Sequence, residues 1–126
     1  MKPAVLLLAA AAFAAVASAA AAPRLKPIMH DWKAKVASAE PMLTGAAPYD
    51  EAELRSVLAS LVSDSQGIEA GITSKSAQAL DIKSRFSQFE ADADATLQSL
   101  GAKDRAKSQF LRMRGECRSC HDAFAN

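Results

Sequence analysis

The fold of this chain is decided by residues 103–124, KDRAKSQFLRMRGECRSCHDAF. Apolar residues recur in this stretch at intervals of three or four, which is the spacing of one face of an α-helix. The same face carries the motif C-x-x-C-H, formed by Cys117, Cys120 and His121. These three side chains therefore lie about one turn apart on a single helix. The predicted face consists of Ala106, Phe110, Met113, Cys117, Cys120, His121 and Phe124.

C-x-x-C-H is the attachment signature of a c-type haem. In such a motif the two thiols add across the haem vinyl groups and the adjacent histidine binds the iron. The sequence thus predicts one covalently bound haem c, held by Cys117 and Cys120, with His121 as an axial ligand. Three alternatives stay open: a thioredoxin-like pair, a zinc site and a disulfide. The first expects a strand–helix context and the second expects four ligands, whereas the only other histidine is the distant His30.

The N-terminal segment predicts export. Lys2 precedes an apolar run from Ala4 to Val16, and Ala17-Ser18-Ala19 fits a signal-peptidase site. We expect residues 1–19 to be a cleaved signal peptide and residues 20–126 to be the single domain of the mature protein. The run is too short and too rich in alanine for a stable membrane anchor. Removing Lys2 leaves equal numbers of basic and acidic side chains, a balance that makes nucleic acid an unsuitable partner. We therefore expect a protein of the bacterial periplasm.

Three further amphipathic segments, at about 25–43, 50–71 and 77–100, precede the motif helix. Short connections between four such segments predict an all-α fold, an antiparallel four-helix bundle. Pro41 should kink or end the first helix, and Asp50 should cap the second. The predicted inward face of the third helix comprises Leu80, Ile82, Phe86, Phe89, Ala93, Leu97 and Leu100.

The iron of a c-type haem either binds a second axial ligand or keeps an open position. Met29 is the best candidate ligand, since it lies on the inward face of the first helix, although plain core packing is the alternative. Met113 shares a helix with His121 and so lies on the wrong side of the haem. Met42 is expected in core or loop packing, and His30 at the surface.

An exported four-helix chain with C-x-x-C-H near its C-terminus resembles the class II cytochromes c, which comprise cytochrome c prime and the low-spin c-556 type. Class I cytochromes c carry this motif near the N-terminus. The resemblance covers the whole mature chain and rests on Cys117, Cys120, His121, Phe86, Phe89, Phe124 and the Gly45–Asp50 stretch.

This resemblance implies thioether links at Cys117 and Cys120 and a proximal iron ligand at His121. In the low-spin branch a methionine early in the first helix is the distal ligand, and Met29 falls at the matching position. The chain departs from that branch just before Met29, where Lys26-Pro27-Ile28 intervenes, and at the bulky Trp32. The coordination of the iron therefore stays open.

The function implied is electron transfer between periplasmic redox partner proteins, with low-spin His/Met coordination. The first alternative is a five-coordinate, high-spin protein like cytochrome c prime that binds NO or CO. The second alternative is a helical module with a disulfide. No catalytic constellation indicates an enzyme. We expect Arg114 and Arg118 to contact haem propionates or to steer an acidic partner. Trp32 and Phe124 are expected to pack against the haem. Relatives of this fold often pair through their first two helices, which makes a homodimer a further expectation.

Overall fold

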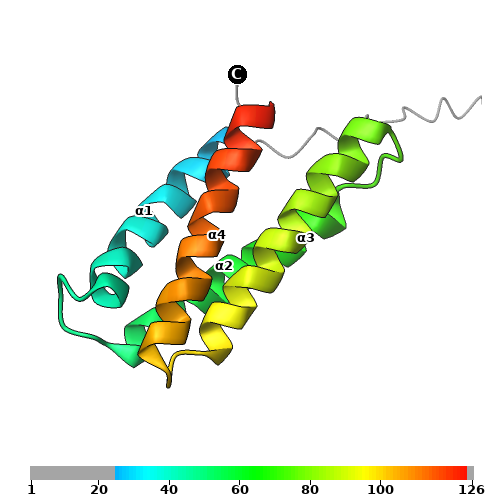
Figure 1. Cartoon of the computed structure of the whole chain (residues 1–126). Coiled ribbons are helices and arrows are strands. Elements are labelled where there is room, and N and C mark those ends of the chain that lie inside the picture. Colours follow the sequence, from blue (N-terminus) through cyan, green and yellow to red (C-terminus); the bar gives the residue numbers. More distant parts are fainter. Residues whose placement is uncertain (1–24, 125–126) are drawn as a thin grey trace, which may run out of the picture.

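The computed structural model describes residues 25–124, which form four α-helices and no β-strand (Figure 1). Helix α1 spans Leu25–Thr44, α2 spans Glu51–Gly71, α3 spans Ala77–Gln98 and α4 spans Lys103–Phe124. The predicted all-α fold is confirmed. None of these four helices is long and apolar enough to cross a membrane. The predicted signal peptide, residues 1–19, lies outside the described residues.

The helices run alternately up and down, so that each is antiparallel to the next along the chain (Figure 1). Helix α3 packs extensively against both α2 and α4, while α1 makes sparser contacts with α2 and α4. Together the four helices form the predicted bundle. Helix α1 is the one least extensively packed against the others.

Helix α1 continues through Pro41 and ends at Thr44. A proline near the end of a helix removes a hydrogen bond from the last turns. The two residues after it, Met42 and Leu43, are buried, and their packing keeps this turn helical. Gly45, at φ +88°, then ends the helix in a left-handed conformation that glycine adopts without strain.

Polar caps fix where α2 and α3 begin. Asp50 is the N-cap of α2, as predicted, and its carboxylate accepts a 3.0 Å hydrogen bond from the backbone N–H of Glu53. The hydroxyl of Ser76 likewise accepts a 3.2 Å hydrogen bond from the backbone N–H of Ala79 at the start of α3. Such caps satisfy backbone donors that have no partner inside the helix.

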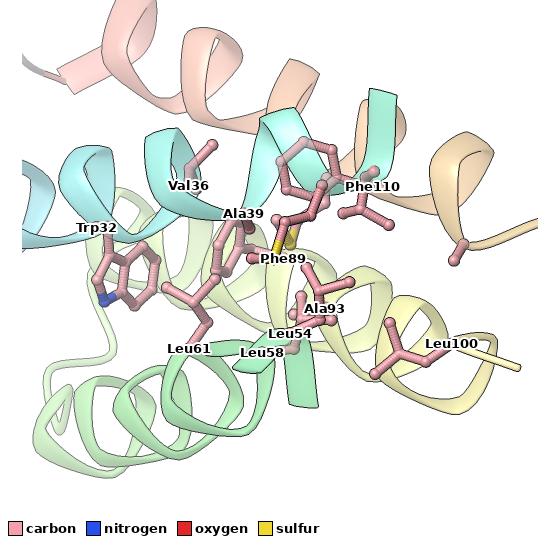
Figure 2. Close-up of a cluster of buried hydrophobic side chains, with 14 of the residues drawn as sticks. Trp32, Val36, Ala39, Leu54, Leu58, Leu61, Phe89, Ala93, Leu100 and Phe110 are labelled. Carbon is pink, nitrogen blue, oxygen red and sulfur yellow. The ribbon is translucent and has the colours of Figure 1, made fainter. Parts of the chain in front are cut away.

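The core lies between the four helices. Figure 2 shows Trp32 of α1, Leu61 of α2 and Phe89 of α3 directed into a common interior. Phe110 and Met113 of α4 are fully buried, so every helix contributes side chains to one core. The other buried apolar residues are Val36, Ala39, Met42, Leu43, Leu54, Leu58, Ile68, Phe86, Ala93, Leu100 and Ala106.

The predicted inward face of α3 is wrong at one position. Leu80 is 52% exposed, because it precedes the buried Phe86 by six positions, which places it about 120° around the helix. Two polar residues, Asp92 and Thr96, are buried on α3 instead. The hydroxyl of Thr96 donates a 2.8 Å hydrogen bond to the backbone carbonyl of Asp92, so its burial leaves no unsatisfied hydroxyl.

Candidate functional site

The C-x-x-C-H motif lies near the C-terminal end of α4, and its side chains differ in exposure. Cys117 and Cys120 are half-buried and are free cysteines, not joined in a disulfide. His121 is exposed. Because α4 stays helical through the motif, the two sulfurs project from one face and the imidazole leaves from its edge. Phe124 ends the helix, and its side chain lies outside the described part of the structure.

The surroundings keep both thiols protonated at neutral pH. Burial, reinforced by the neighbouring Cys120 and Glu116, raises the pKa of Cys117 to about 11. Burial also raises the pKa of Cys120, although the guanidinium of Arg85 acts in the opposite direction. A thioredoxin-like redox pair depends on a cysteine with a lowered pKa. These raised pKa values therefore disfavour that alternative.

A small cavity lies beside the motif, between α1, α3 and α4. Its volume is about 20 Å³, room for about one water molecule. The cavity brings together Met29 and Trp32 from the start of the described chain and Cys117 and Cys120 from its end. His121 is not among the lining residues, which are Met29, Trp32, Arg85, Phe86, Phe89, Glu116, Cys117 and Cys120.

Trp32 forms the aromatic wall of this cavity and is held from two sides. Its ring stacks on Phe89, with centroids 4.5 Å apart, and meets Phe86 edge-on at 5.7 Å. Its indole N–H donates a 3.1 Å hydrogen bond to Asp64 of α2. The same carboxylate accepts a 3.0 Å hydrogen bond from Lys35. The indole is therefore fixed in position by both stacking and hydrogen bonding.

On its other side Trp32 borders a larger groove between α1 and α2, of about 610 Å³. The groove is lined by Pro27 and Ile28 from α1, and by Gly67 and Gly71 from α2, among others. A Cβ atom added at either glycine would have no neighbour within 4 Å. Trp32 thus separates a nearly filled cavity from an open groove.

The two arginines that the sequence analysis singled out near the motif differ in their surroundings. Arg114 forms an ion pair with Glu40 and so links α4 to α1, and Arg118 is exposed. Arg85 of α3, which the sequence pattern does not single out, lines the cavity. Its guanidinium donates a 3.0 Å hydrogen bond to the hydroxyl of Ser119, inside the motif. Its place beside an inward phenylalanine on α3 is the only sequence signal for this role.

Glu116 is the second cavity residue that the sequence does not single out. Its Oε2 atom is buried and has no hydrogen-bond partner. Burial, followed by the neighbouring carboxyl of Asp92, raises the pKa of Glu116 to about 8, although Arg112 acts in the opposite direction. Asp92 is itself buried and accepts a 3.2 Å hydrogen bond from the amide of Gln88. Glu116 is thus a carboxylic acid held largely protonated at neutral pH beside Cys117.

The side chains around the cavity fit a covalently attached haem in kind. Two neutral thiols lie one turn apart, a thioether lies on the facing helix, and aromatic rings form a flat apolar wall. The cavity volume is far smaller than the several hundred Å³ of ordinary ligand sites. A planar macrocycle therefore does not fit this cavity with the side chains as they lie in the structure.

Within residues 25–124, no three His, Cys, Asp or Glu side chains gather closely enough to hold a metal ion by themselves. Comparison of the chain with models of protein families, with curated proteins and with solved structures found no match. Function is therefore inferred from the residues and geometry of this chain alone.

Proposed function

We propose that this protein is a mono-haem c-type cytochrome of the class II kind, which transfers electrons between redox partner proteins in the bacterial periplasm. The observation that supports this best is the shared cavity of Met29, Cys117 and Cys120. These residues come from opposite ends of the chain, and the antiparallel packing of α1 and α4 brings them together.

Each of these side chains has a distinct task in the proposal. Cys117 and Cys120 hold the haem through thioether bonds, and His121 binds the iron from α4. Met29 offers its thioether sulfur from α1, the helix across the cavity. When bound, the haem iron supplies one-electron chemistry, alternating between the ferric and ferrous states. An imidazole and a thioether together favour six-coordinate, low-spin iron, which suits electron transfer.

The aromatic side chains and the buried core exclude water from the site. Phe86 and Phe89 are 2% and 4% exposed, so these two rings of the α3 wall are shielded from solvent. The oxidised and reduced states of the iron differ in charge. A low dielectric around the iron therefore changes the free-energy difference between these two states. We infer that these residues set the reduction potential of the iron through burial.

A methionine substitution tests the coordination. Met29→Leu preserves volume but removes the sulfur, and should convert the iron from low spin to high spin. Met42→Leu is the matched control: Met42 is also on α1 but is not among the residues lining the cavity, so this variant should keep the low-spin spectrum. Absorption spectra of the oxidised and reduced proteins report the spin state. An unchanged low-spin spectrum in Met29→Leu would exclude Met29 as the ligand.

The apolar wall of Trp32, Phe86 and Phe89 also suits a small apolar gas, which favours the five-coordinate alternative as the second candidate. Carbon monoxide separates the two. Rapid and complete binding to the reduced wild-type protein, from a high-spin starting spectrum, would support gas binding over electron transfer. A haem stain on a denaturing gel tests attachment itself, because only covalently bound haem survives denaturation.

A further inference from the structure

We propose that one side of α4 is a docking surface for an acidic patch on a partner protein, with Leu111 as its apolar centre and cations around it. This surface, the α4 row, consists of Lys103, Lys107, Leu111, Arg114 and Arg118. The inference gives the chemistry of the redox partner and in that sense rests on the proposed function. No member of the row lines the cavity beside the motif.

Helical spacing puts these five side chains on one side of α4. They recur at intervals of three or four residues, which is the spacing of neighbours along a helix surface. Three of them directly follow a buried residue, the buried residues being Ala106, Phe110 and Met113. One residue is a step of about 100° around the helix, so the row lies beside the core-facing side. From Lys103 to Arg118 the row extends about 22 Å.

The ion pair between Arg114 and Glu40 shows that the row borders α1. Lys33 lies seven residues before Glu40, and Lys26 seven residues before that, so both share the side of α1 that carries Glu40. Both lysines are exposed. Cations from two helices therefore flank the seam between α1 and α4. Within residues 25–124, the pair of Arg114 with Glu40 is the ion pair that crosses this seam.

Leu111 supplies the apolar contact of the surface. It is 37% exposed, and in the described part of the chain Leu80 is the other large hydrophobic residue left exposed. Leu111 lies one turn from both Lys107 and Arg114 on α4. Gly115, the next residue on its side of the helix, leaves open space beside it, since a Cβ atom there would have no neighbour within 4 Å. An accessible apolar side chain with charges around it matches the centre and polar rim of a protein interface.

The charges of the molecule are segregated between helices, which favours an acidic partner. Helix α4 has six basic and three acidic residues, and α1 has three and two. Helix α2 has one basic and four acidic residues, and α3 has two and four. The side formed by α1 and α4 is therefore positive, and the side formed by α2 and α3 is negative. An acidic protein patch is attracted to the first side and repelled by the second, which orients it during approach.

An anionic bilayer or a nucleic acid fits the α4 row less well than a protein does. A helix that binds a bilayer surface buries several bulky apolar side chains, whereas the row contains Leu111 alone. Unpaired bases stack on exposed aromatic rings, and the row has no aromatic member. An acidic patch of a protein matches the length of the row, its charge and its single apolar centre.

A labelled helical peptide with glutamates around one central leucine is the probe. Fluorescence anisotropy measures its binding to the full chain at low and at physiological ionic strength. The chain should bind this peptide more tightly than a matched peptide with lysines for glutamates, and added salt should weaken the binding. Lys107→Glu should weaken it about fivefold. Lys75→Glu makes the same charge reversal at an exposed position before α3 and should leave binding unchanged.

A second pair of variants tests the apolar centre. Leu111→Ser should weaken binding about fivefold, whereas Leu80→Ser, at the other exposed leucine, should have no effect. Equal weakening by Lys107→Glu and Lys75→Glu would show a response to net charge alone and would overturn the inference. Binding that Leu111→Ser leaves unchanged would also overturn it.

Vesicles of phosphatidylglycerol and phosphatidylcholine separate a membrane from a protein partner. Tighter binding to these vesicles than to the acidic peptide, lost in Lys107→Glu, would replace the protein partner by a bilayer. The haem stain keeps the proposed function separate. A positive stain without peptide binding refutes the docking surface alone. A negative stain with binding that depends on the α4 row refutes the redox role and leaves the docking surface standing.

Discussion

Replacing Glu116 by glutamine should stabilise the protein at alkaline pH. In the folded protein the pKa of Glu116 is raised from its ordinary value of 4.5 to about 8. Between these two values the folded protein keeps a proton that the unfolded chain has released. The free energy of unfolding must therefore decrease as the pH rises through this window, and the loss is complete above pH 8. Glutamine carries no titrating proton, so the variant should not show this decrease.

The size of the effect follows from the surroundings of the carboxyl group. A fully buried proton site would cost about 1.4 kcal/mol for each pH unit of the window. Glu116 is only half-buried, so solvent screens a large part of that cost. The penalty for one unsatisfied polar atom, about 1–3 kcal/mol, is the more realistic measure. Above pH 8 we expect the free energy of unfolding of Glu116→Gln to exceed that of the wild type by about this amount. The amide of the new glutamine can then donate a hydrogen bond to Asp92.

Urea unfolding followed by circular dichroism, repeated across the pH range, measures this difference. Glu53→Gln serves as the reference, because Glu53 is exposed near the start of α2 and the variant makes the same chemical substitution at a solvated position. The wild type and Glu53→Gln should decline together between pH 4.5 and about 8, while Glu116→Gln declines less. If all three curves run parallel, the carboxyl of Glu116 is ionised at no cost in the folded protein. The assignment of a buried acid at this position would then be refuted.

Two other substitutions test the framework of the site. Trp32→Phe keeps an aromatic ring against Phe89 but removes the 3.1 Å hydrogen bond to Asp64; it should lower the free energy of unfolding in urea by about 1 kcal/mol, and an unchanged midpoint would show that this bond contributes nothing. Asp50→Ala removes the N-cap of α2 and should cost about 1 kcal/mol in the same assay, whereas Asp50→Asn, which keeps a capping oxygen, should restore most of the loss.

The helices could be predicted from the sequence because their signals are local. A 3.6-residue apolar period and a cap such as Asp50 act within one helix, and the structure confirms both. The predicted limit of the first helix, at about residue 43, agrees with its observed end at Thr44. What the sequence left open at Pro41, a kink or an end, depends on packing between helices, since Met42 and Leu43 are buried there.

The candidate site likewise has one part that the sequence predicts and another that only the structure reveals. Spacing alone identifies the motif cysteines as candidate haem-attachment residues. The structure shows in addition that Met29 lines the same cavity as these cysteines. The sequence pattern does not identify Glu116 and Arg85 as site residues, because a charged residue on an amphipathic helix is ordinarily solvated. Their positions depend on the register between α3 and α4, which brings Asp92 to Glu116 and Ser119 to Arg85. A sequence pattern cannot provide that register.

The position of Trp32 indicates which part of the bundle would move to admit the proposed haem. Its ring occupies the space between α1 and the motif, stacked on Phe89, while the groove on its other side is open over Gly67 and Gly71. Helix α1 has sparser contacts than the other three helices, so its displacement disrupts the least packing. Because Met29 lies one turn before Trp32 on the same helix, a shift of α1 that clears the indole from Phe89 also moves the thioether. In the proposed haem protein, ligation by Met29 and displacement of Trp32 would therefore occur together.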